Sequence, residues 1–265
     1  MKKRIIVNGA CGRMGQEVVK TIVLEREDIL VGVCDRINVG KNIMELLALD
    51  AEKLIIKDDL EGLIRETRPE VIIDFTTPTV VMENIRIGLS NGVNMIVGTT
   101  GITEVDLEII EKMARENKAN ILIAPNFALG AVLMMRFAAE AARYFHAVEI
   151  IELHHDQKLD SPSGTAIKTA ELINKNRKED RGSEKEEIEK LSGARGADAE
   201  GVKIHSVRLP GLVAHQEVIF GGEGQTLLIR HDSYNRKSFM PGVKLALDRI
   251  ADISGLVYGL EHLLD

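Results

Sequence analysis

The segment Glu152–Thr165, which reads ELHHDQKLDSPSGT, holds the densest group of reactive side chains in the chain. Two adjacent imidazoles, His154 and His155, are followed three residues later by the ammonium of Lys158. Imidazole and ammonium groups deliver protons to reacting atoms, and a positive ammonium attracts a carboxylate. Successive strand residues point to opposite faces, so the two imidazoles serve one site only if the chain leaves strand geometry there. The spacing indicates a site that binds an anion and protonates it.

The turn Ser161–Thr165 comes directly before a helical pattern that ends near Asn176. Backbone amides at the start of a helix have no partner within the helix, and they bind anions well. We therefore expect the amides of Gly164 and Thr165, together with the Thr165 hydroxyl, to hold a carboxylate. The alternative is a plain serine-capped helix start with exposed histidines. The histidines have no convincing third partner for zinc, so we expect no metal.

A glycine-rich turn between an apolar run and a helical pattern forms a second candidate site, with the residues Gly9, Ala10, Cys11, Gly12, Arg13, Met14 and Gly15. Glycines in this place let the backbone approach the pyrophosphate of a dinucleotide, and a tight turn without a ligand is the alternative. Asp35 ends the next predicted strand and suits a ribose hydroxyl, whereas Arg36 suits a 2′-phosphate. Both NADH and NADPH therefore remain possible cofactors.

Two further turns follow predicted strands, at Gly98-Thr99-Thr100-Gly101 and at Ala124-Pro125-Asn126-Phe127. Ligands bind at the carboxyl ends of the strands in open parallel sheets. For the first turn, an ordinary strand-to-helix connection capped by Thr103 is an equal alternative. For the second, we expect the backbone and Phe127 to lie beside the nicotinamide. Together these features suggest an enzyme that reduces a small polyanion with a nicotinamide cofactor.

In the first 126 residues, short apolar runs alternate with amphipathic helical patterns. The predicted strands are Arg4–Asn8, Ile29–Asp35, Val71–Phe75, Asn94–Val97 and Asn120–Ile123, and the predicted helices are Gln16–Glu27, Thr79–Ser90 and Thr103–Asn117. Continuous apolar strands, each followed by a helix, indicate a parallel sheet that is covered on both faces. Right-handed crossovers then give an α/β fold with a doubly wound, Rossmann-type sheet.

After Pro125 the pattern changes to that of a smaller α+β domain with a largely antiparallel or mixed sheet. It predicts helices at Ala131–Arg143 and Thr165–Asn176, strands at Ala147–His154, Val202–Arg208, Val213–Phe220 and Gln225–Arg230, and a turn at Gly221–Gly224. The mixed charges of Lys175–Lys190 indicate a solvated helix end and excursion. Helices over Lys237–Leu247 and Ile250–Leu264 are expected to return to the first domain.

The composition limits the class of partner. The chain has 265 residues, 45% of them hydrophobic, which is enough for a real core. A net charge of −7 offers no basic surface, so we expect no nucleic-acid or membrane partner. Two cysteines fit a reducing cytoplasm, and the apolar run near the N-terminus is too short for a signal peptide.

The motifs together resemble the 4-hydroxy-tetrahydrodipicolinate reductase family, also called dihydrodipicolinate reductase, of lysine and diaminopimelate biosynthesis. The long Glu152–Thr165 segment is the most specific of them, and the glycine turn is the least. The resemblance covers nearly the whole chain and includes Asp74–Thr76, Gly98–Gly101, Ala124–Phe127, Leu209–Gln216, Gly221–Gln225 and His231–Ser233. Cys11 departs from the glycine that is frequent in the family at its position.

The resemblance implies NAD(P)H-dependent reduction of a small dicarboxylate heterocycle, 4-hydroxy-tetrahydrodipicolinate, to tetrahydrodipicolinate and water. It implies that His154 donates and accepts a proton, that Lys158 is the catalytic proton donor, and that His155, Gly164 and Thr165 bind the substrate carboxylates. It assigns cofactor contacts to Gly9–Gly15, Asp35, Arg36, Gly98, Thr99, Thr100 and Ala124–Phe127. It further implies a cytoplasmic homotetramer with a dinucleotide-binding domain at 1–126, a substrate-binding and oligomerisation domain at 127–235, and returning C-terminal helices at 236–265.

Two rival functions share some of these features. Another two-domain dehydrogenase, of the homoserine or aspartate type, would share the glycine turn but has no need for the histidines and lysine before Ser-Gly-Thr. A nucleotide-sensing regulator would bind the cofactor without any reaction. Hydrogen-bonded structural roles are favoured over roles in the site for His205, His215, His231 and Arg236.

Overall fold

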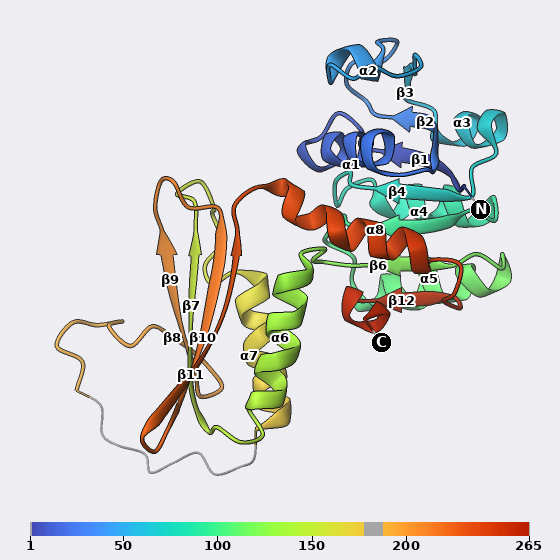
Figure 1. Ribbon diagram of the computed structural model, residues 1–265. Helices are drawn as coiled ribbons and strands as arrows, with labels where there is room; N and C mark the ends of the chain where they lie inside the picture. The colour runs from blue at the N-terminus through green and yellow to red at the C-terminus, as the bar shows by residue number, and fades with distance from the viewer. Residues whose placement is uncertain (1, 178–187, 265) are drawn as a thin grey trace. The chain divides into compact units, whose positions relative to one another are not determined.

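The computed structural model describes residues 2–177 and 188–264, so part of the predicted excursion Lys175–Lys190 lies outside the described residues. The chain divides into two compact units (Figure 1). Unit 1 comprises Met1–Phe127 and Phe239–Asp265, and unit 2 comprises Ala128–Ser238. None of the helices within the described ranges is long and apolar enough to cross a membrane.

Unit 1 contains a seven-stranded parallel sheet, which confirms the predicted doubly wound fold. In spatial order its strands are β12 (Leu256–Tyr258), β6 (Ile121–Ile123), β5 (Asn94–Val97), β4 (Val71–Asp74), β1 (Arg4–Asn8), β2 (Ile29–Cys34) and β3 (Ile56–Lys57). The strand order reverses between β1 and β4, which is where open α/β sheets bind their ligands. The central strands β1 and β4 are buried and mostly apolar, as is typical of strands covered by helices on both faces, and each ends in a polar residue, Asn8 or Asp74.

The helices of unit 1 make two sets of contacts with one another, one among α3, α4 and α5 and one between α1 and α8. They are α1 (Arg13–Glu25), α2 (Ile43–Leu46), α3 (Leu60–Thr67), α4 (Val81–Ser90), α5 (Glu104–Glu116), α8 (Met240–Arg249) and the short 3₁₀ turn η2 (Leu260–Leu263). Helix α4 contacts α3 and α5, and α1 contacts α8. Ile6 and Ile72 join the core beneath α3, α4 and α5, whereas their neighbours Ile5 and Ile73 point to the other face and are equally buried.

The predicted helix over Ile250–Leu264 is wrong. Helix α8 ends at Arg249, and Leu256–Tyr258 instead forms β12, which pairs in parallel with β6 at the edge of the sheet. Gly255 and Gly259 flank this strand with φ of +69° and +105°, values that end a helix and favour glycine. The predicted C-terminal helices are therefore one helix, one strand and one 3₁₀ turn.

Several other elements differ from the prediction in extent. Helix α1 begins at Arg13, three residues before the predicted start, and the short elements α2, β3 and α3 lie in a region for which no element was predicted. The remaining boundaries agree within a few residues, as expected for fraying ends.

Unit 2 is a mixed sheet, as predicted, with two helices on one face (Figure 1). The sheet has five strands, and β8 (Ala197–Ala199) was not predicted. Its strands in spatial order are β11 (Gln225–Ser233), β10 (Ala214–Gly222), β7 (Ala147–His154), β9 (Val202–Arg208) and β8 (Ala197–Ala199), and its helices are α6 (Leu129–Ala141) and α7 (Gly164–Asn176). Strands β7 and β9 run parallel, and the other neighbours are antiparallel. The turn η1 (Arg236–Phe239) follows β11.

Candidate active site

The glycine turn after β1 has the geometry of a dinucleotide cradle. Gly9 has a φ of +78°, and its amide and that of Ala10 donate to the carbonyl of Cys34 at 2.8 and 3.2 Å. A Cβ atom on Gly15 would lie 2.0 Å from the Gly9 carbonyl oxygen, so only glycine lets α1 approach the turn this closely. Helix α1 has no side-chain cap and no acidic residue in its first turn, which leaves its start open to an anion.

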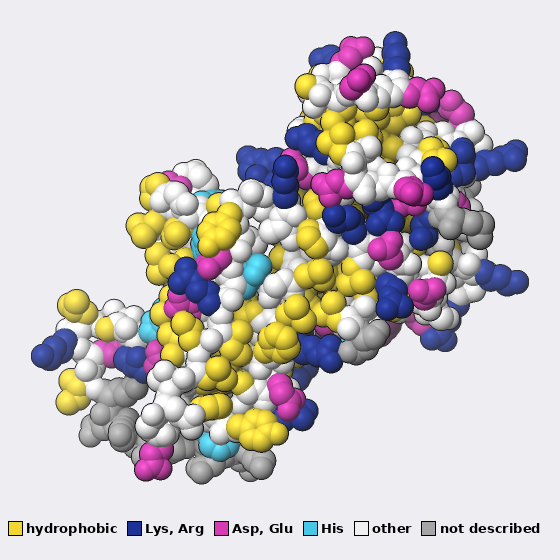
Figure 2. Space-filling model, in the orientation of Figure 1, with side chains coloured by type: hydrophobic (Ala, Val, Ile, Leu, Met, Phe, Trp, Pro, Cys, Tyr) yellow, Lys and Arg dark blue, Asp and Glu magenta, His cyan; other side chains and the backbone are white. Residues whose placement is uncertain are grey.

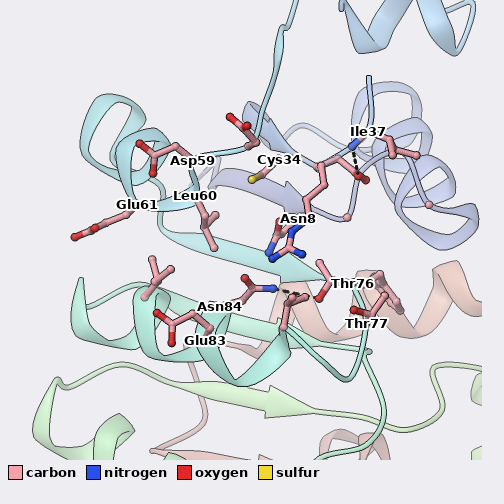
Figure 3. A pocket seen from close by; sticks show the side chains of 18 residues that line it. Asn8, Cys34, Ile37, Asp59, Leu60, Glu61, Thr76, Thr77, Glu83 and Asn84 are labelled. Atoms are coloured by element: carbon pink, nitrogen blue, oxygen red, sulfur yellow. Dashed lines mark hydrogen bonds between the residues drawn. The ribbon is translucent and has the colours of Figure 1, made fainter. Parts of the chain in front are cut away.

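A pocket of about 560 Å³ opens beside this turn (Figure 3). It is lined by four of the predicted cofactor residues, Gly9, Gly12, Asp35 and Arg36. Most of its wall comes from residues to which the sequence analysis gave no role in the site, on the β3–α3 and β4–α4 connections and on α3 and α4: Asp58, Asp59, Leu60, Glu61, Thr76, Thr77, Val80, Glu83, Asn84 and Ile87. The position of Thr76 and Thr77 after a buried strand was a signal that could have pointed to them.

The carboxylate of Asp35 braces the glycine turn. It accepts hydrogen bonds from the amides of Cys11 at 2.8 Å and Ile37 at 3.1 Å, while Arg36 beside it is exposed. Burial and the nearby Asp35 raise the pKa of the Cys11 thiol, and burial above all raises the pKa of Cys34 to about 12. Both thiols therefore stay protonated at neutral pH.

Asp74 is a buried hub that joins the ends of three strands. Its carboxylate accepts hydrogen bonds from Asn8 at the end of β1 at 2.8 Å, from Asn84 of α4 at 2.8 Å and from the hydroxyls of Thr76 and Thr99 at 2.7 and 2.8 Å. The Thr99 side chain thus ties the turn after β5 to the turn after β4. The sequence analysis quoted Asp74 only as part of a motif and gave it no role.

The two later turns lie close to each other in the core of unit 1. A Cβ atom on Gly98 would lie 2.0 Å from the ring of Phe75, and that ring is 5.5 Å from the ring of Phe127. Phe127 is only 2% exposed. Its ring therefore serves packing in this structure, and the contact with a nicotinamide stays a prediction. The amide of Ala124 donates to Val97 at 2.9 Å, which fixes the start of the second turn.

In unit 2, His154 belongs to a buried hydrogen-bonded cluster at the end of β7. Glu152 and His154 share the face of the sheet that packs on α6 and α7, and the register places Arg208 of β9 opposite His154. The Nδ1 atom of His154 lies 2.5 Å from Glu152 Oε2, and Arg208 donates to both oxygens of Glu152 at 2.9 and 2.7 Å. The side chain of Glu152 is 0% exposed.

The chain leaves strand geometry immediately after His154. His155 is exposed, and its carbonyl accepts from the amide of Lys158 at 3.2 Å, which turns the chain back. The ammonium of Lys158 lies 2.7 and 2.9 Å from the two carboxylate oxygens of Asp160. Arg208 also donates to the carbonyl of Asp160 at 2.8 Å, so one guanidinium connects the surroundings of His154 with the loop of Lys158.

Helix α7 begins as the anion hypothesis requires. Ser163 is its N-cap, and the Ser163 hydroxyl accepts from the amide of Ala166 at 3.2 Å. No acidic residue lies in the first turn, and a Cβ atom on Gly164 would meet nothing within 4 Å, so the space beside its Cα is open. The neighbouring Thr165 is half-buried. The serine cap is therefore present, and the binding of an anion at this helix start stays a prediction.

The other histidines in the sheet of unit 2 form hydrogen bonds with residues outside the cluster of Glu152, His154 and Arg208. His205 Nε2 lies 2.8 Å from Glu149, His215 Nδ1 lies 2.6 Å from Asp232, and His231 Nε2 lies 3.1 Å from the Ser233 hydroxyl. Glu149 points to the face of the sheet opposite Glu152, because the two are an odd number of residues apart.

A doubly wound unit with a glycine cradle, together with a separate unit that carries a histidine, a lysine and an open helix start, defines a two-domain oxidoreductase. The model of the N-terminus of dihydrodipicolinate reductase matches residues 3–127, and the model of its C-terminus matches residues 130–264. The chain belongs to the dihydrodipicolinate reductase family.

Individual relatives agree with this assignment over the full length of the chain. It is 51% identical over 262 residues to a 4-hydroxy-tetrahydrodipicolinate reductase of Bacillus velezensis, covering 99% of this chain and 98% of the relative. It is 52% identical over 262 residues to the same enzyme of Listeria welshimeri, covering 99% and 100%. A solved dihydrodipicolinate reductase of Paenisporosarcina sp. TG-14, with dipicolinate bound, is 48% identical with a TM-score of 0.88 and covers 100% of both chains.

More distant structures share only the fold. An amine dehydrogenase of Mycobacterium smegmatis is 15% identical with a TM-score of 0.69, covering 97% of this chain and 95% of the other. The architecture therefore serves several oxidoreductases, and the reaction has to be argued from the site.

Proposed function

We propose that this enzyme reduces (2S,4S)-4-hydroxy-2,3,4,5-tetrahydrodipicolinate to (S)-2,3,4,5-tetrahydrodipicolinate and water, in the biosynthesis of diaminopimelate and lysine, with NADH or NADPH. The observation that carries the proposal is the arrangement after β7. A hydrogen-bonded imidazole at His154, an ammonium at Lys158 and an open helix start at Gly164 all lie within eleven consecutive residues. A ring with two carboxylates has anions that an ammonium and the amides of a helix start can bind.

Unit 1 is the proposed holder of the pyridine nucleotide. The glycine cradle fits a pyrophosphate, because Gly9 and Gly15 leave no room for a side chain between the turn and α1. The proposed contacts are Gly9–Gly15, Asp35, Arg36, Gly98–Thr100 and Ala124–Phe127. The reduced nicotinamide, when bound, supplies a hydride. Asp35 favours a free ribose hydroxyl and Arg36 a 2′-phosphate, which supports use of either cofactor.

The start of α7 is the proposed seat of a substrate carboxylate. The amides of Gly164 and Thr165 lie at the positive end of the helix, and the Ser163 hydroxyl accepts from the amide of Ala166. His155 is exposed and able to donate to a carboxylate as well. We assign the binding of the substrate carboxylates to His155, Gly164 and Thr165.

His154 and Lys158 are the proposed acid–base groups. Loss of the substrate hydroxyl with a ring proton as water leaves a double bond, and addition of a hydride to it leaves an enamine. One further proton converts this enamine into the product, and His154 and Lys158 are the proposed suppliers of that proton. In the absence of substrate, the Lys158 ammonium is held by the carboxylate of Asp160, whose pKa its hydrogen bond lowers. A substrate carboxylate would compete with Asp160 for this cation.

The assembly is proposed to be a cytoplasmic homotetramer built through unit 2. The sheet face opposite α6 and α7 carries Ile151, Leu153, Ile219 and Leu228 beside the charged side chains of Glu149, Glu217 and Arg230, and Leu228 is 53% exposed. An open sheet face with exposed apolar side chains is typical of an interface between subunits. Figure 2 shows hydrophobic side chains among charged ones on the surface of unit 2.

The proposed reaction is tested by following the near-ultraviolet absorbance of NADH and NADPH with the condensation product of pyruvate and aspartate semialdehyde. We expect the absorbance to fall only when both the enzyme and this substrate are present. A nucleotide-sensing regulator would consume no reduced cofactor with any substrate. A dehydrogenase of the homoserine or aspartate type would instead consume it with those substrates, and either result would refute the proposed function.

A further inference from the structure

We propose that Glu152 and Arg208 are positioning residues, which fix the orientation and the tautomer of His154 so that its Nε2 atom is the nitrogen that exchanges a proton. The inference rests on the proposed role of His154 as an acid–base group. It adds two residues with a defined task to the reaction, one of them from a distant strand.

The first step is the geometry of the hydrogen bonds to Glu152. Its carboxylate lies 2.5 Å from His154 Nδ1 and receives both terminal nitrogens of Arg208, at 2.9 and 2.7 Å. A fork of this kind fixes the plane of the carboxylate, and the fixed carboxylate in turn fixes the imidazole ring. Glu152 is fully buried, so water does not compete with His154 and Arg208 for its carboxylate.

The second step is the protonation state. Burial alone would raise the pKa of Glu152, but hydrogen bonds from His154, Arg208 and Ser206 outweigh it and hold the pKa at about 2. Glu152 is therefore a carboxylate at neutral pH, and a carboxylate can only accept. Nδ1 must then carry its hydrogen in the neutral and in the charged imidazole, which leaves Nε2 as the site of proton exchange.

The third step is the link to Lys158. The same Arg208 nitrogen that binds Glu152 Oε1 also donates to the carbonyl of Asp160, and Asp160 holds the Lys158 ammonium. The amide of Leu209, next to Arg208, donates to the carbonyl of His154 at 3.1 Å. Arg208 and its neighbour thus join both ends of the short loop that separates the two proposed acid–base groups.

The same strand offers a matched control. Glu149 also accepts from a histidine and an arginine, His205 at 2.8 Å and Arg195, but it lies on the opposite face of the sheet. It has the same kinds of partner as Glu152 but is 34% exposed, and it has no contact with His154 among the hydrogen bonds of the described residues. Its replacement tests what loss of a Glu–His–Arg cluster does to unit 2 in general.

The experiment compares Glu152→Gln, Arg208→Lys and the control Glu149→Gln in the full-length enzyme. Nitrogen-15 NMR of the ligand-free enzyme, with the His154 signal assigned by its loss in His154→Asn, reports which ring nitrogen carries the hydrogen. Steady-state kinetics give kcat and KM for the substrate, and fluorescence titration gives the Kd of the reduced cofactor. Circular dichroism and oligomer size are checked for each variant.

We expect Glu152→Gln to lower kcat by about 10–100-fold, which is typical of the loss of a group that orients a functional histidine. KM and the cofactor Kd should change less than about threefold, because the variant keeps the residues that are proposed to bind the substrate and the cofactor. The Nδ1-protonated fraction of His154 should fall. Arg208→Lys, which keeps one donor, should retain more activity than Arg208→Met, and Glu149→Gln should keep the wild-type kcat.

Wild-type kcat in a folded Glu152→Gln variant, or an unchanged tautomer, would overturn the inference. If Glu152→Gln does not fold, the order of activity of Arg208→Lys and Arg208→Met decides, and equal activities would refute the positioning role. The NMR readout needs no turnover, so failure of the wild-type enzyme to reduce the substrate would refute the proposed function separately.

Discussion

The ammonium of Lys158 is the single group on which the proposed proton chemistry depends most. It is 21% exposed and lies 2.7 Å from a carboxylate oxygen of Asp160. Lys158→Ala should lower kcat by about 10² to 10⁴-fold, the usual size of a general-acid contribution. Lys168→Ala is the control, because Lys168 is an exposed residue of α7 that pairs with Glu171. An unaltered kcat in Lys158→Ala would remove the residue from the mechanism.

A second residue-scale prediction concerns His231, which packs against Gly130 of α6. Burial lowers its pKa below 6.5, Asp232 opposes this effect and His215 adds to it. As the pH falls through 6.5, the unfolded chain takes up a proton before the folded one, so the free energy of unfolding should decrease.

Denaturant titrations of the wild type and of His231→Gln at a series of pH values measure this effect. The variant should show a smaller loss of stability on acidification. Equal pH slopes for the two proteins would show that His231 is not the responsible group.

For individual residues, the sequence was informative where the reactive side chains lie within one short segment. His154, Lys158, Gly164 and Thr165 were predicted from one segment, and the roles that we propose for them still rest on that reasoning. Arg208 was missed because it is 56 positions from Glu152 in sequence. Only the register of β7 with β9 brings the two together, and no local pattern reports that register.

At the scale of elements, the contact between the glycine turn and α1 is the feature that shapes the proposed cofactor site. Gly15→Ala would place a Cβ atom 2.0 Å from the Gly9 carbonyl and push the helix away from the turn. We expect a loss of about 1–3 kcal/mol in the free energy of unfolding, as for overpacked cores. The affinity for NADH and NADPH should fall as well.

Chemical denaturation and cofactor titration check this prediction. Gly221→Ala is the control, since a Cβ atom there would meet only the Ala147 side chain at 3.8 Å. Unchanged cofactor affinity in Gly15→Ala would show that the approach of α1 to the turn does not form the site.

Elements were predicted best where a run of apolar residues is bounded by polar ones. The runs Arg4–Asn8, Asn94–Val97 and Ala147–His154 are strands with the predicted bounds. Strand β12 was missed because three residues are too few to show a period, although Gly255 and Gly259 on either side of it were a signal. Helix α3 was missed although Asp59 caps it and Leu60, Leu63 and Ile64 have helical spacing.

At the scale of the whole molecule, the open sheet face of unit 2 underlies the proposed homotetramer. Light scattering coupled to gel filtration should give about four times the chain mass of 29.2 kDa. Leu228→Asp places a charge among the apolar side chains of this face and should shift the enzyme to oligomers with fewer subunits. A monomeric wild type, or a Leu228→Asp variant with unchanged mass, would contradict an interface at this face.

The central claim is that this enzyme transfers a hydride from a nicotinamide to a dicarboxylated ring. The most direct measurement uses NADH or NADPH carrying deuterium at C4 of the nicotinamide and determines the mass of the ring product. We predict that one deuterium appears at C4 of tetrahydrodipicolinate when the cofactor is labelled on the transferred side. A product free of deuterium with the label on either side would contradict the claim.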